Sequence, residues 1–531
     1  MRPLNLSELS VEQKIGQMLL ARPPINKKDR DFIHGLIKDR ALGGIHATAR
    51  FRRFDTDLDG DELDEIRSYH ALAEYPILVC EDMEFGYARG TIQLPPPLAI
   101  GSADSEALAY EFAKLTAVEA RAVGYNTVFG PLFDIALNPR SSCLGPRTFG
   151  GDAEHVARLA TAAVKGYQDQ GMVVTAKHYP GFGESQVDSH LGMVYLSGDE
   201  DSLVQRELLP YIRAMHEADL SAVMVGHIMV PKVDCQYPAS LSPALIGLLR
   251  RIGFDGLIMT DSFSMVGVTN RFGLEECHRL AMAAGNDMVM TNYRIGARAA
   301  YEFMLKAFRD GCVSEQQIDA AVAHVVAAQN RTLRQPSQTA VTQKDFDTAD
   351  EMARRAIAVE LRQADEAAIA VTGQHLFIIE QGNPFIHPES GALYHERHAL
   401  DTAVDLLKAK FTASSFIKID EFPSKAEMEH VLNATIPYHS VVLVAYNRSV
   451  SYMGSSDLTN RLLALIDAIA HKLSAVVLFG NPFAARQMAP IPRLIYGFDN
   501  ALCQRYAVLT LAGEHRPVGR LPLAVDAFAG G

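Results

Sequence analysis

The feature that most constrains the fold of this chain is an alternation of short apolar runs with longer amphipathic stretches. Seven runs rich in Val and Ile occur before residue 300, and stretches with the apolar spacing of a helix separate them. Parallel strands are buried on both faces and need crossover helices, so this alternation predicts a parallel α/β sheet. The runs are GGIHA (43–47), ILVCED (77–82), TVFGPLFD (127–134), VVTAKHYPG (173–181), AVMVGHIMVP (222–231), LIMTDSF (257–263) and DMVMTN (287–292).

Polar residues at the C-terminal ends of nearly all these runs favour a closed (β/α)8 barrel of the TIM type. Such a barrel gathers its active site at that end, whereas an open doubly wound sheet concentrates polar residues near one crevice. The pattern does not assign an eighth strand. Before the first run, Ser10 and Gln13 form a capping-box pattern, and Val11, Ile15 and Met18 to Leu19 share one face of a predicted helix.

The length of 531 residues exceeds what one hydrophobic core usually organises, and the pattern changes near residue 335. A capping-box pattern at Ser314 and Gln317 predicts a last helix of the first domain. The polar stretch RQPSQTAVTQ (334–343) then lacks periodicity and is typical of a linker. Strand-like runs resume after it and predict a smaller α/β sandwich domain. They are HLFIIE (375–380), SVVLVAYN (440–447), AVVLFGNP (475–482) and RLIYGFD (493–499), with a helical stretch at 458–473. The predicted division is a barrel at 1–335, a linker at 336–350 and a second domain at 351–531.

Charge and cysteine content argue against several function classes. The formal net charge of -13, without a basic run, disfavours nucleic acid and anionic membranes as partners. The first residues lack the pattern of a secretory signal, and no stretch has the apolar length of a membrane span. The six cysteines are far apart, without a CxxC or CxxH spacing. We therefore expect a cytoplasmic protein with reduced thiols.

The densest polar cluster runs from Lys177 to Glu184 and continues to Asp188, Ser189 and His190. Its basic residues at the end of a strand are suited to donating hydrogen bonds to sugar hydroxyls. Asp188 is close enough in sequence to orient the His190 imidazole and support its protonated form, so this pair is a candidate general acid and base. The alternative is a solvated polar loop with one structural histidine.

Asp261 directly follows a buried apolar run in GFDGLIMTDSFSM. A carboxylate at the C-terminal end of a barrel strand is well placed to act as a nucleophile. The alternative is a helix N-cap with Ser262 and Ser264 as local partners.

Together these segments resemble the family 3 glycoside hydrolases, and among them the β-N-acetylhexosaminidases of bacterial cell-wall recycling. KHYPGFGESQVDSH is similar to the loop signature K-H-F-P-G-H-G-D-x-x-x-D-S-H of that subgroup, and GFDGLIMTDSFSM to its nucleophile segment. The DSH element is the most specific part, because family 3 β-glucosidases lack it. Weaker matches are KIGQML (14–19), NPRSSCLGPRTFGGD (138–152), HIMVP (227–231), AGNDMV (284–289) and GRLPL (519–523).

The resemblance implies a retaining hydrolysis through a covalent intermediate. Asp261 would be the nucleophile, His190 the acid/base and Asp188 its partner in a dyad. The remaining implied residues would bind the substrate: Lys177, His178 and Arg147 its hydroxyls and acetamido group, and Asp82 the hydroxyls furthest from the scissile bond. For His227 a sugar contact and a structural role both stay open. No cofactor or metal is implied, and the expected partner is a small saccharide, bound by a monomer or homodimer.

The sequence departs from the family pattern at two loops. Where D-Q-E-G-G is common, Asp82 is followed by Met83, Glu84, Phe85 and Gly86, which adds bulk beside the predicted sugar site. Phe182 and Glu184 replace the more usual His and Asp of the acid/base loop.

Other functions compete with this interpretation. Within the enzyme class they are a family 3 β-glucosidase and a phosphorylase that transfers the sugar to phosphate. Histidines 178, 190 and 227 suggest a metal hydrolase, although their spacing is poor for ligands. A barrel that binds or senses a sugar without catalysis is the alternative of another class.

Overall fold

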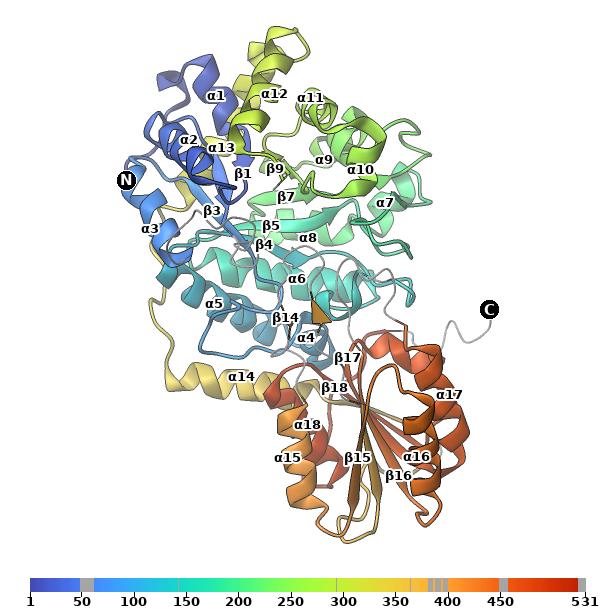
Figure 1. Ribbon diagram of the computed structural model, residues 1–531. Helices are drawn as coiled ribbons and strands as arrows, with labels where there is room; N and C mark the ends of the chain where they lie inside the picture. The colour runs from blue at the N-terminus through green and yellow to red at the C-terminus, as the bar shows by residue number, and fades with distance from the viewer. Residues whose placement is uncertain are drawn as a thin grey trace.

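A computed structural model of the chain describes residues 1–47, 62–141, 143–292, 294–362, 364–380, 385–386, 393–394, 400–447 and 457–523. Two α/β domains follow one another along the chain, and the second lies below the first in the view of Figure 1. None of the described helices combines the length and apolar character that crossing a membrane requires.

The first domain is a nearly closed barrel of eight parallel strands. Its strands follow the order β10-β1-β2-β3-β4-β5-β7-β9, and a bridge between Met259 and Met288 joins the two ends of this order. All seven predicted runs contain a barrel strand. The strands are β1 (Leu19–Ala21), β2 (Gly44–His46), β3 (Leu78–Asp82), β4 (Thr127–Leu132), β5 (Val173–Tyr179), β7 (Ala222–Val225), β9 (Leu257–Thr260) and β10 (Val289–Met290).

The eighth strand is β1, which the sequence pattern did not assign. Ser10 and Gln13 form the expected capping box, but helix α1 (Val11–Gln17) ends before Leu19. Leu19 instead pairs with Val289 and Leu20 with Gly44. The prediction that Leu19 continues the helix is therefore wrong, because pairing with strands far along the chain outweighs the local helical spacing.

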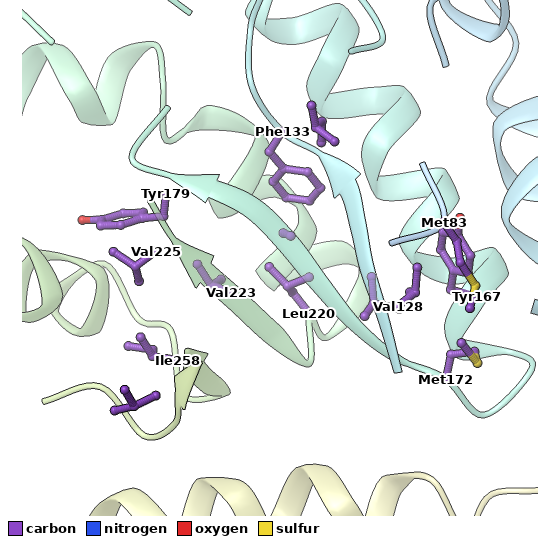
Figure 2. Close-up of a cluster of buried hydrophobic side chains, with 14 of the residues drawn as sticks. Met83, Val128, Phe133, Tyr167, Met172, Tyr179, Leu220, Val223, Val225 and Ile258 are labelled. Carbon is purple, nitrogen blue, oxygen red and sulfur yellow. The ribbon is translucent and has the colours of Figure 1, made fainter. Parts of the chain in front are cut away.

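Helices surround the barrel on its outside, and apolar side chains fill both its interior and the layer beneath the helices. Leu20, Phe129 and Met259 are among the interior side chains, whereas Val128, Val223 and others point into the outer layer shown in Figure 2. The helices are α2 (Lys27–Lys38), α3 (Glu62–Leu72), α4 (Pro97–Ala103), α5 (Glu106–Val123), α6 (Ala153–Gln168), α7 (Glu200–Gln205), α8 (Leu209–Ala218), α9 (Pro243–Arg251), α10 (Val266–Phe272), α11 (Leu274–Ala284), α12 (Ala297–Arg309) and α13 (Glu315–Arg331). The short strands β6 (Val194–Tyr195) and β8 (Ile228–Met229) pair outside the barrel.

The second domain is a six-stranded sheet with helices on both faces, as the sandwich prediction requires. Its order is β11-β18-β17-β16-β12-β15, with β11 antiparallel to β18. Side chains that alternate along the strands enter two separate apolar clusters, one on each face. The elements are α14 (Gln343–Ala356), β11 (Ala358–Leu361), β12 (Leu376–Glu380), β13 (Phe385–Ile386), β14 (Leu393–Tyr394), α15 (Asp401–Lys410), β15 (Ser415–Ile419), α16 (Lys425–Thr435), β16 (Val441–Asn447), α17 (Asn460–Ile469), β17 (Leu473–Gly480), β18 (Arg493–Phe498) and α18 (Ala501–Leu511).

Helix α14 begins at Gln343, within the predicted linker 336–350. A second connection comes from the end of the described chain. Ser102 Oγ donates a hydrogen bond to Ala356 O at 2.6 Å, and Ser102 O accepts one from Arg520 N at 2.9 Å. Leu98 of α4 also packs in an apolar cluster of the second domain. Hydrogen bonds and apolar packing thus hold the domains together on both sides of the linker.

Candidate active site

Two carboxylates and two cations form an ion-pair cluster at the C-terminal ends of β3 and β5. Lys177 Nζ lies 2.6 Å from Asp82 Oδ1 and 2.6 Å from Glu84 Oε1. Arg147 forms two hydrogen bonds to Glu84, of 2.5 Å from Nε and 2.8 Å from Nη2, and a third of 2.6 Å from Nη1 to Cys143 O. The Lys177 side chain is only 3% exposed, so its charge is balanced by protein groups rather than by water.

The charges in this cluster stabilise one another. Burial by itself would raise the pKa of both acids, but Lys177 lowers the pKa of Asp82 to about 2. Arg147 and Lys177 likewise hold the pKa of Glu84 well below its usual value. Burial would lower the pKa of Lys177, yet the two carboxylates raise it. All four side chains are therefore ionised at neutral pH.

His178 is oriented by a buried carboxylate, Asp134, which ends the third predicted run. Asp134 Oδ2 accepts hydrogen bonds from the His178 ring at Nδ1 (2.8 Å) and from its backbone N–H (3.1 Å). Asp134 Oδ1 accepts another from the backbone N–H of Phe182 at 2.8 Å. One carboxylate thus fixes both the His178 ring and the start of the loop that follows β5. The other ring nitrogen, Nε2, lies 4.0 Å from Asp261 Oδ2.

Asp261 follows β9 directly and has one carboxylate oxygen held and one available. Its Oδ1 accepts a hydrogen bond from the backbone N–H of Ser262 at 2.7 Å. Its Oδ2 is buried, and no described residue donates a hydrogen bond to it. An ionisable oxygen in this situation is costly for folding alone, which points to a function in binding or catalysis. The side chain does not cap a helix, because α10 begins at Val266 after Met265.

Asp188 and His190, which the sequence predicts to form a dyad, are in direct contact. Asp188 Oδ1 accepts hydrogen bonds from His190 Nδ1 at 2.6 Å and from His190 N at 2.9 Å. The Asp188 side chain is fully buried, whereas that of His190 is 19% exposed. Nδ1 therefore carries the proton that faces Asp188, and Nε2 is the ring nitrogen on the side away from this carboxylate.

His227 lies beneath the loop that carries Asp261. Its Nδ1 is 2.8 Å from Ser240 Oγ, its Nε2 is 3.0 Å from Ser262 O, and its ring stacks on Phe263. Burial lowers the pKa of His227, although the negative charge of Asp261 opposes this. A neutral ring that donates from Nε2 and accepts at Nδ1 satisfies both contacts. This geometry supports the structural role among the two that the sequence left open.

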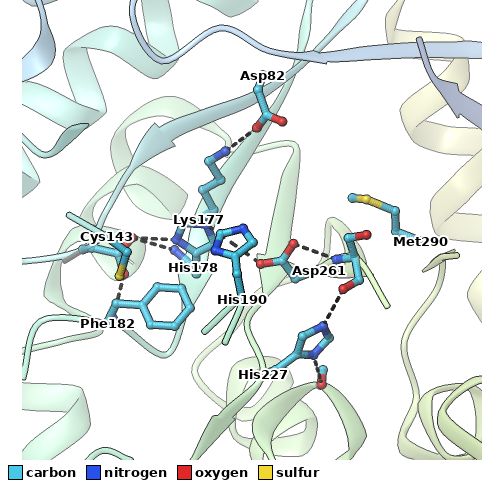
Figure 3. A network of polar contacts seen from close by, with 12 residues as sticks. Asp82, Cys143, Lys177, His178, Phe182, His190, His227, Asp261 and Met290 are labelled. Carbon is cyan, nitrogen blue, oxygen red and sulfur yellow. Dashed lines mark hydrogen bonds and ion pairs between the residues drawn. The ribbon is translucent and has the colours of Figure 1, made fainter. Parts of the chain in front are cut away.

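Figure 3 shows the side chains of Lys177, His178 and Asp261 converging from the ends of β5 and β9. The charges of Asp261, His190 and His178 all act on the His227 ring, which places these groups in one electrostatic environment. The arrangement provides a carboxylate oxygen without a hydrogen-bond donor among the described residues, an imidazole oriented by a second carboxylate, and a cluster of ion pairs. These are the parts that displacement at a sugar anomeric carbon requires.

Comparison with known proteins agrees with this chemistry. The sequence profile described as the glycosyl hydrolase family 3 N terminal domain matches residues 10–328, which is more than half of the chain. The chain belongs to glycosyl hydrolase family 3. The family and the fold expected from the sequence are thus confirmed.

Individual relatives of this family 3 protein carry related names. A β-N-acetylglucosaminidase/β-glucosidase of Cellulomonas fimi is 29% identical over 61% of this chain and 58% of its own length. A β-hexosaminidase of Thiobacillus denitrificans is 34% identical over 48% of this chain and 72% of its own. The solved structure of a family 3 β-N-acetylglucosaminidase from Paenibacillus sp. str. FPU-7 superposes with a TM-score of 0.82 at 28% identity, covering 97% of this chain and 99% of that one. These relatives support the predicted enzyme class, β-N-acetylhexosaminidase.

The structure adds two acids to the predicted site residues, Glu84 and Asp134, which the sequence analysis did not single out. In the sequence, Glu84 was noted only as part of a loop that differs from the family pattern. Asp134 was noted only as the last residue of an apolar run. The polar ends of strand runs were the signal for Asp134, whereas nothing local indicated that Glu84 would bind both Arg147 and Lys177. Each guanidinium nitrogen of Arg147 already donates to a protein oxygen, so this side chain supports the site from behind Glu84.

Two of the residues that depart from the family pattern, Phe182 and Glu184, have structural explanations. The Phe182 ring is buried and packs edge-on against His178, with ring centres 4.7 Å apart. Glu184 accepts hydrogen bonds from Ser197 N at 3.1 Å and Ser197 Oγ at 2.7 Å, and it pairs with Arg206. Both residues therefore anchor the loop that carries the dyad.

The metal-hydrolase alternative gains no support from the geometry. His178, His190 and His227 each bind a different protein oxygen. Among the described residues, one group has the spacing of metal ligands, namely His46, Glu81 and Asp82. Arg22 Nη1 donates to His46 Nδ1 and Lys177 donates to Asp82, so two cationic side chains already bind ligand atoms of this group.

Proposed function

We propose that this protein is a retaining exo-β-N-acetylhexosaminidase that removes terminal β-linked N-acetylglucosamine from small saccharides or cell-wall fragments in the cytoplasm. The observation that carries the proposal is Asp261 Oδ2, to which no described residue donates a hydrogen bond and which lies 4.0 Å from His178 Nε2, in the same electrostatic environment as His190. The names of the relatives support the acetamido sugar as substrate.

In the first step, Asp261 Oδ2 attacks the anomeric carbon while Oδ1 stays bound to the Ser262 N–H. A bond from carbon to Asp261 forms as the bond to the leaving oxygen breaks, and His190 Nε2 gives its proton to that oxygen. Asp188 stabilises the imidazolium before this transfer by its charge and its hydrogen bond. The fixed charges of Asp82, Glu84 and Lys177 are expected to bind the sugar hydroxyls without reorganising.

In the second step, neutral His190 takes a proton from water, and the resulting oxygen nucleophile displaces Asp261 from the same face that the leaving group occupied. Two inversions give net retention, and Asp261 and protonated His190 are restored. Asp261 and His190 therefore have the same charges at the end of the cycle as at its start.

The test is a panel of 4-nitrophenyl β-glycosides that differ only at the 2-position, assayed with the complete protein. We expect kcat/KM for the N-acetylglucosaminide to exceed that for the glucoside by at least ~10²-fold, because a site built around a polar substituent rejects analogues that lack it. The first sugar formed should be the β-anomer by ¹H NMR. Asp261→Asn should lower kcat by at least ~10³-fold with the fold intact.

Three results of this panel would contradict the proposal. Preference for the glucoside would favour a β-glucosidase, and formation of sugar 1-phosphate when phosphate is added would favour a phosphorylase. Absence of turnover on every sugar would favour the sugar-binding alternative.

A further inference from the structure

The acid/base loop and the helix that follows the nucleophile touch through their backbones at two glycines. Gly267 lies in the first turn of α10, and Gly192 lies just after the dyad. A Cβ atom at Gly267 would be 2.5 Å from Gly192 O, 2.7 Å from Gly192 C and 3.2 Å from Met193 N. Any residue with a side chain at position 267 would therefore push the loop away from the helix, because both partners are backbone.

Gly192 closes the turn that holds the dyad. Its N–H donates a hydrogen bond to Asp188 O at 3.0 Å, and Leu191 N donates to the same oxygen at 2.9 Å. Asp188 in turn binds the ring and the backbone of His190 through its carboxylate. A displacement of Gly192 is thus transmitted to the imidazole through one short turn.

Gly267 is also linked to the nucleophile, Asp261, through a short stretch of backbone. Ser262 N donates to Asp261 Oδ1 at 2.7 Å, and Met265 N donates to Ser262 O at 3.2 Å before α10 begins at Val266. His227 holds Ser262 O from below at 3.0 Å. The first turn of α10 therefore stays fixed relative to Asp261, and a clash at Gly267 will move the loop.

We propose that the contact between Gly192 and Gly267 sets the distance between the acid/base histidine and the nucleophile, so that Gly267 is a positioning residue. The inference rests on the proposed function, because it concerns the geometry of His190 and Asp261 around one anomeric carbon. Displacing a reacting group by about 1 Å costs on the order of 10²-fold in rate.

The experiment compares Gly267→Ala with Gly35→Ala. Both glycines lie in helices, but a Cβ at Gly35 in α2 meets nothing within 4 Å. Alanine is the better helix former, so Gly35→Ala reports the effect of the substitution without a clash. Thermal unfolding and circular dichroism establish that both variants are folded.

Each protein is assayed on the 2,4-dinitrophenyl and phenyl β-glycosides of N-acetylglucosamine. Dinitrophenolate departs without a proton, whereas phenolate needs one from His190, and kcat/KM reports this bond-breaking step alone. For Gly267→Ala we expect a loss of ~10- to 100-fold on the phenyl glycoside and less than ~3-fold on the dinitrophenyl glycoside. Gly35→Ala should match the wild type on both.

The outcomes separate the two proposals. Equal losses on the two glycosides, or no loss, would overturn the positioning role of Gly267 while leaving the hydrolase intact. Failure of the wild type to hydrolyse either glycoside would overturn the proposed function, and the positioning role with it.

If Gly267→Ala does not fold, hydrogen exchange on the wild type decides. If α10 holds the loop, the backbone amides of Gly192 and Met193 should exchange as slowly as the amides within α10. Exchange of these two amides at the rate of an open loop would overturn the inference.

Discussion

At the scale of single residues, the site depends on carboxylates that act through a basic neighbour. The side chains of Asp188 and Asp134 are fully buried, and each binds the Nδ1 of a histidine whose side chain is more exposed. This arrangement fixes the orientation of the ring. In the proposed dyad, the residue that reacts, His190, is therefore different from the residue that orients it.

Replacing the imidazole of the dyad tests this division of roles. His190→Ala should lower kcat/KM for the phenyl N-acetylglucosaminide by roughly 10²–10⁴-fold, the usual contribution of acid/base catalysis. The dinitrophenyl glycoside should be hydrolysed slowly because no base activates water, and added azide should restore its turnover. Wild-type kinetics on both glycosides would show that His190 is not the acid/base.

Glu84 offers a second test at this scale. Glu84→Gln leaves Arg147 and Lys177 with less negative charge in a buried place, and breaking a buried ion pair costs about 3–5 kcal/mol. We expect a loss of stability near the lower end of this range in urea unfolding, and a KM raised by roughly tenfold because Lys177 is displaced.

The matched control for Glu84 is Glu106→Gln. Glu106 also pairs with an arginine, Arg158, but its side chain is 53% exposed. A surface pair of this kind contributes about 0–1 kcal/mol. Similar losses of unfolding free energy in both variants would show that the buried cluster contributes no more to stability than a surface ion pair.

At the scale of elements, one histidine couples helix α11 to the last barrel strand. His278 Nδ1 is 2.8 Å from Leu274 O within the helix, and Nε2 is 3.2 Å from Thr291 Oγ1 just after β10. The ring is completely buried, and this burial lowers the pKa of His278 to about 4. The contact thus requires a neutral ring, which makes it sensitive to acid.

The pH dependence follows from the direction of this shift. The unfolded chain binds a proton at His278 below about pH 6.5, whereas the folded chain resists protonation until about pH 4. His278 therefore contributes no destabilisation above pH 6.5, and the free energy of unfolding falls by about 2 kcal/mol between pH 7 and pH 5 on its account. His278→Asn should be less stable at pH 7 but lose less on acidification, as urea unfolding at both pH values will measure.

A surface histidine provides the control for this measurement. His216→Asn on the exposed side of α8 should leave the pH dependence of unfolding unchanged. If His278→Asn and wild type lose the same free energy between pH 7 and pH 5, burial of the ring does not govern this dependence.

At the scale of the whole molecule, described parts of the second domain pack against the barrel. Leu98 of α4 is completely buried in an apolar cluster that belongs mainly to the second domain. The 3-10 helix Pro482–Gln487 also contacts the 3-10 helix Gly145–Arg147, which carries one cation of the site. Packing between the domains therefore reaches Arg147.

A cavity at this junction should affect both stability and binding. Leu98→Ala should destabilise the protein by about 2–5 kcal/mol, as for other buried leucines, and raise KM more than it lowers kcat. Leu432→Ala, in α16 at 37% exposure, should change stability by less than about 0.5 kcal/mol. Equal effects of the two substitutions would mean that the domains do not depend on this packing.

The sequence by itself determined which segments become central strands and where helices begin. Runs such as 173–181 and 440–447 are buried on both faces, and the capping boxes at Ser10 and Ser314 formed as predicted. The edge strands β11 and β15 were not predicted, because they are partly exposed and lack a continuous apolar run. Local spacing reports burial well, so it predicts an element best where burial is complete.

Only the tertiary structure decided which polar groups meet. Lys177 with Glu84, His178 with Asp134 and Gly192 with Gly267 are contacts between segments far apart in the chain. Their geometry arises when barrel closure brings the strand ends together, and no local pattern encodes the distance between two loops. The strand ends could therefore be predicted from the sequence, whereas the pairing of their side chains could not.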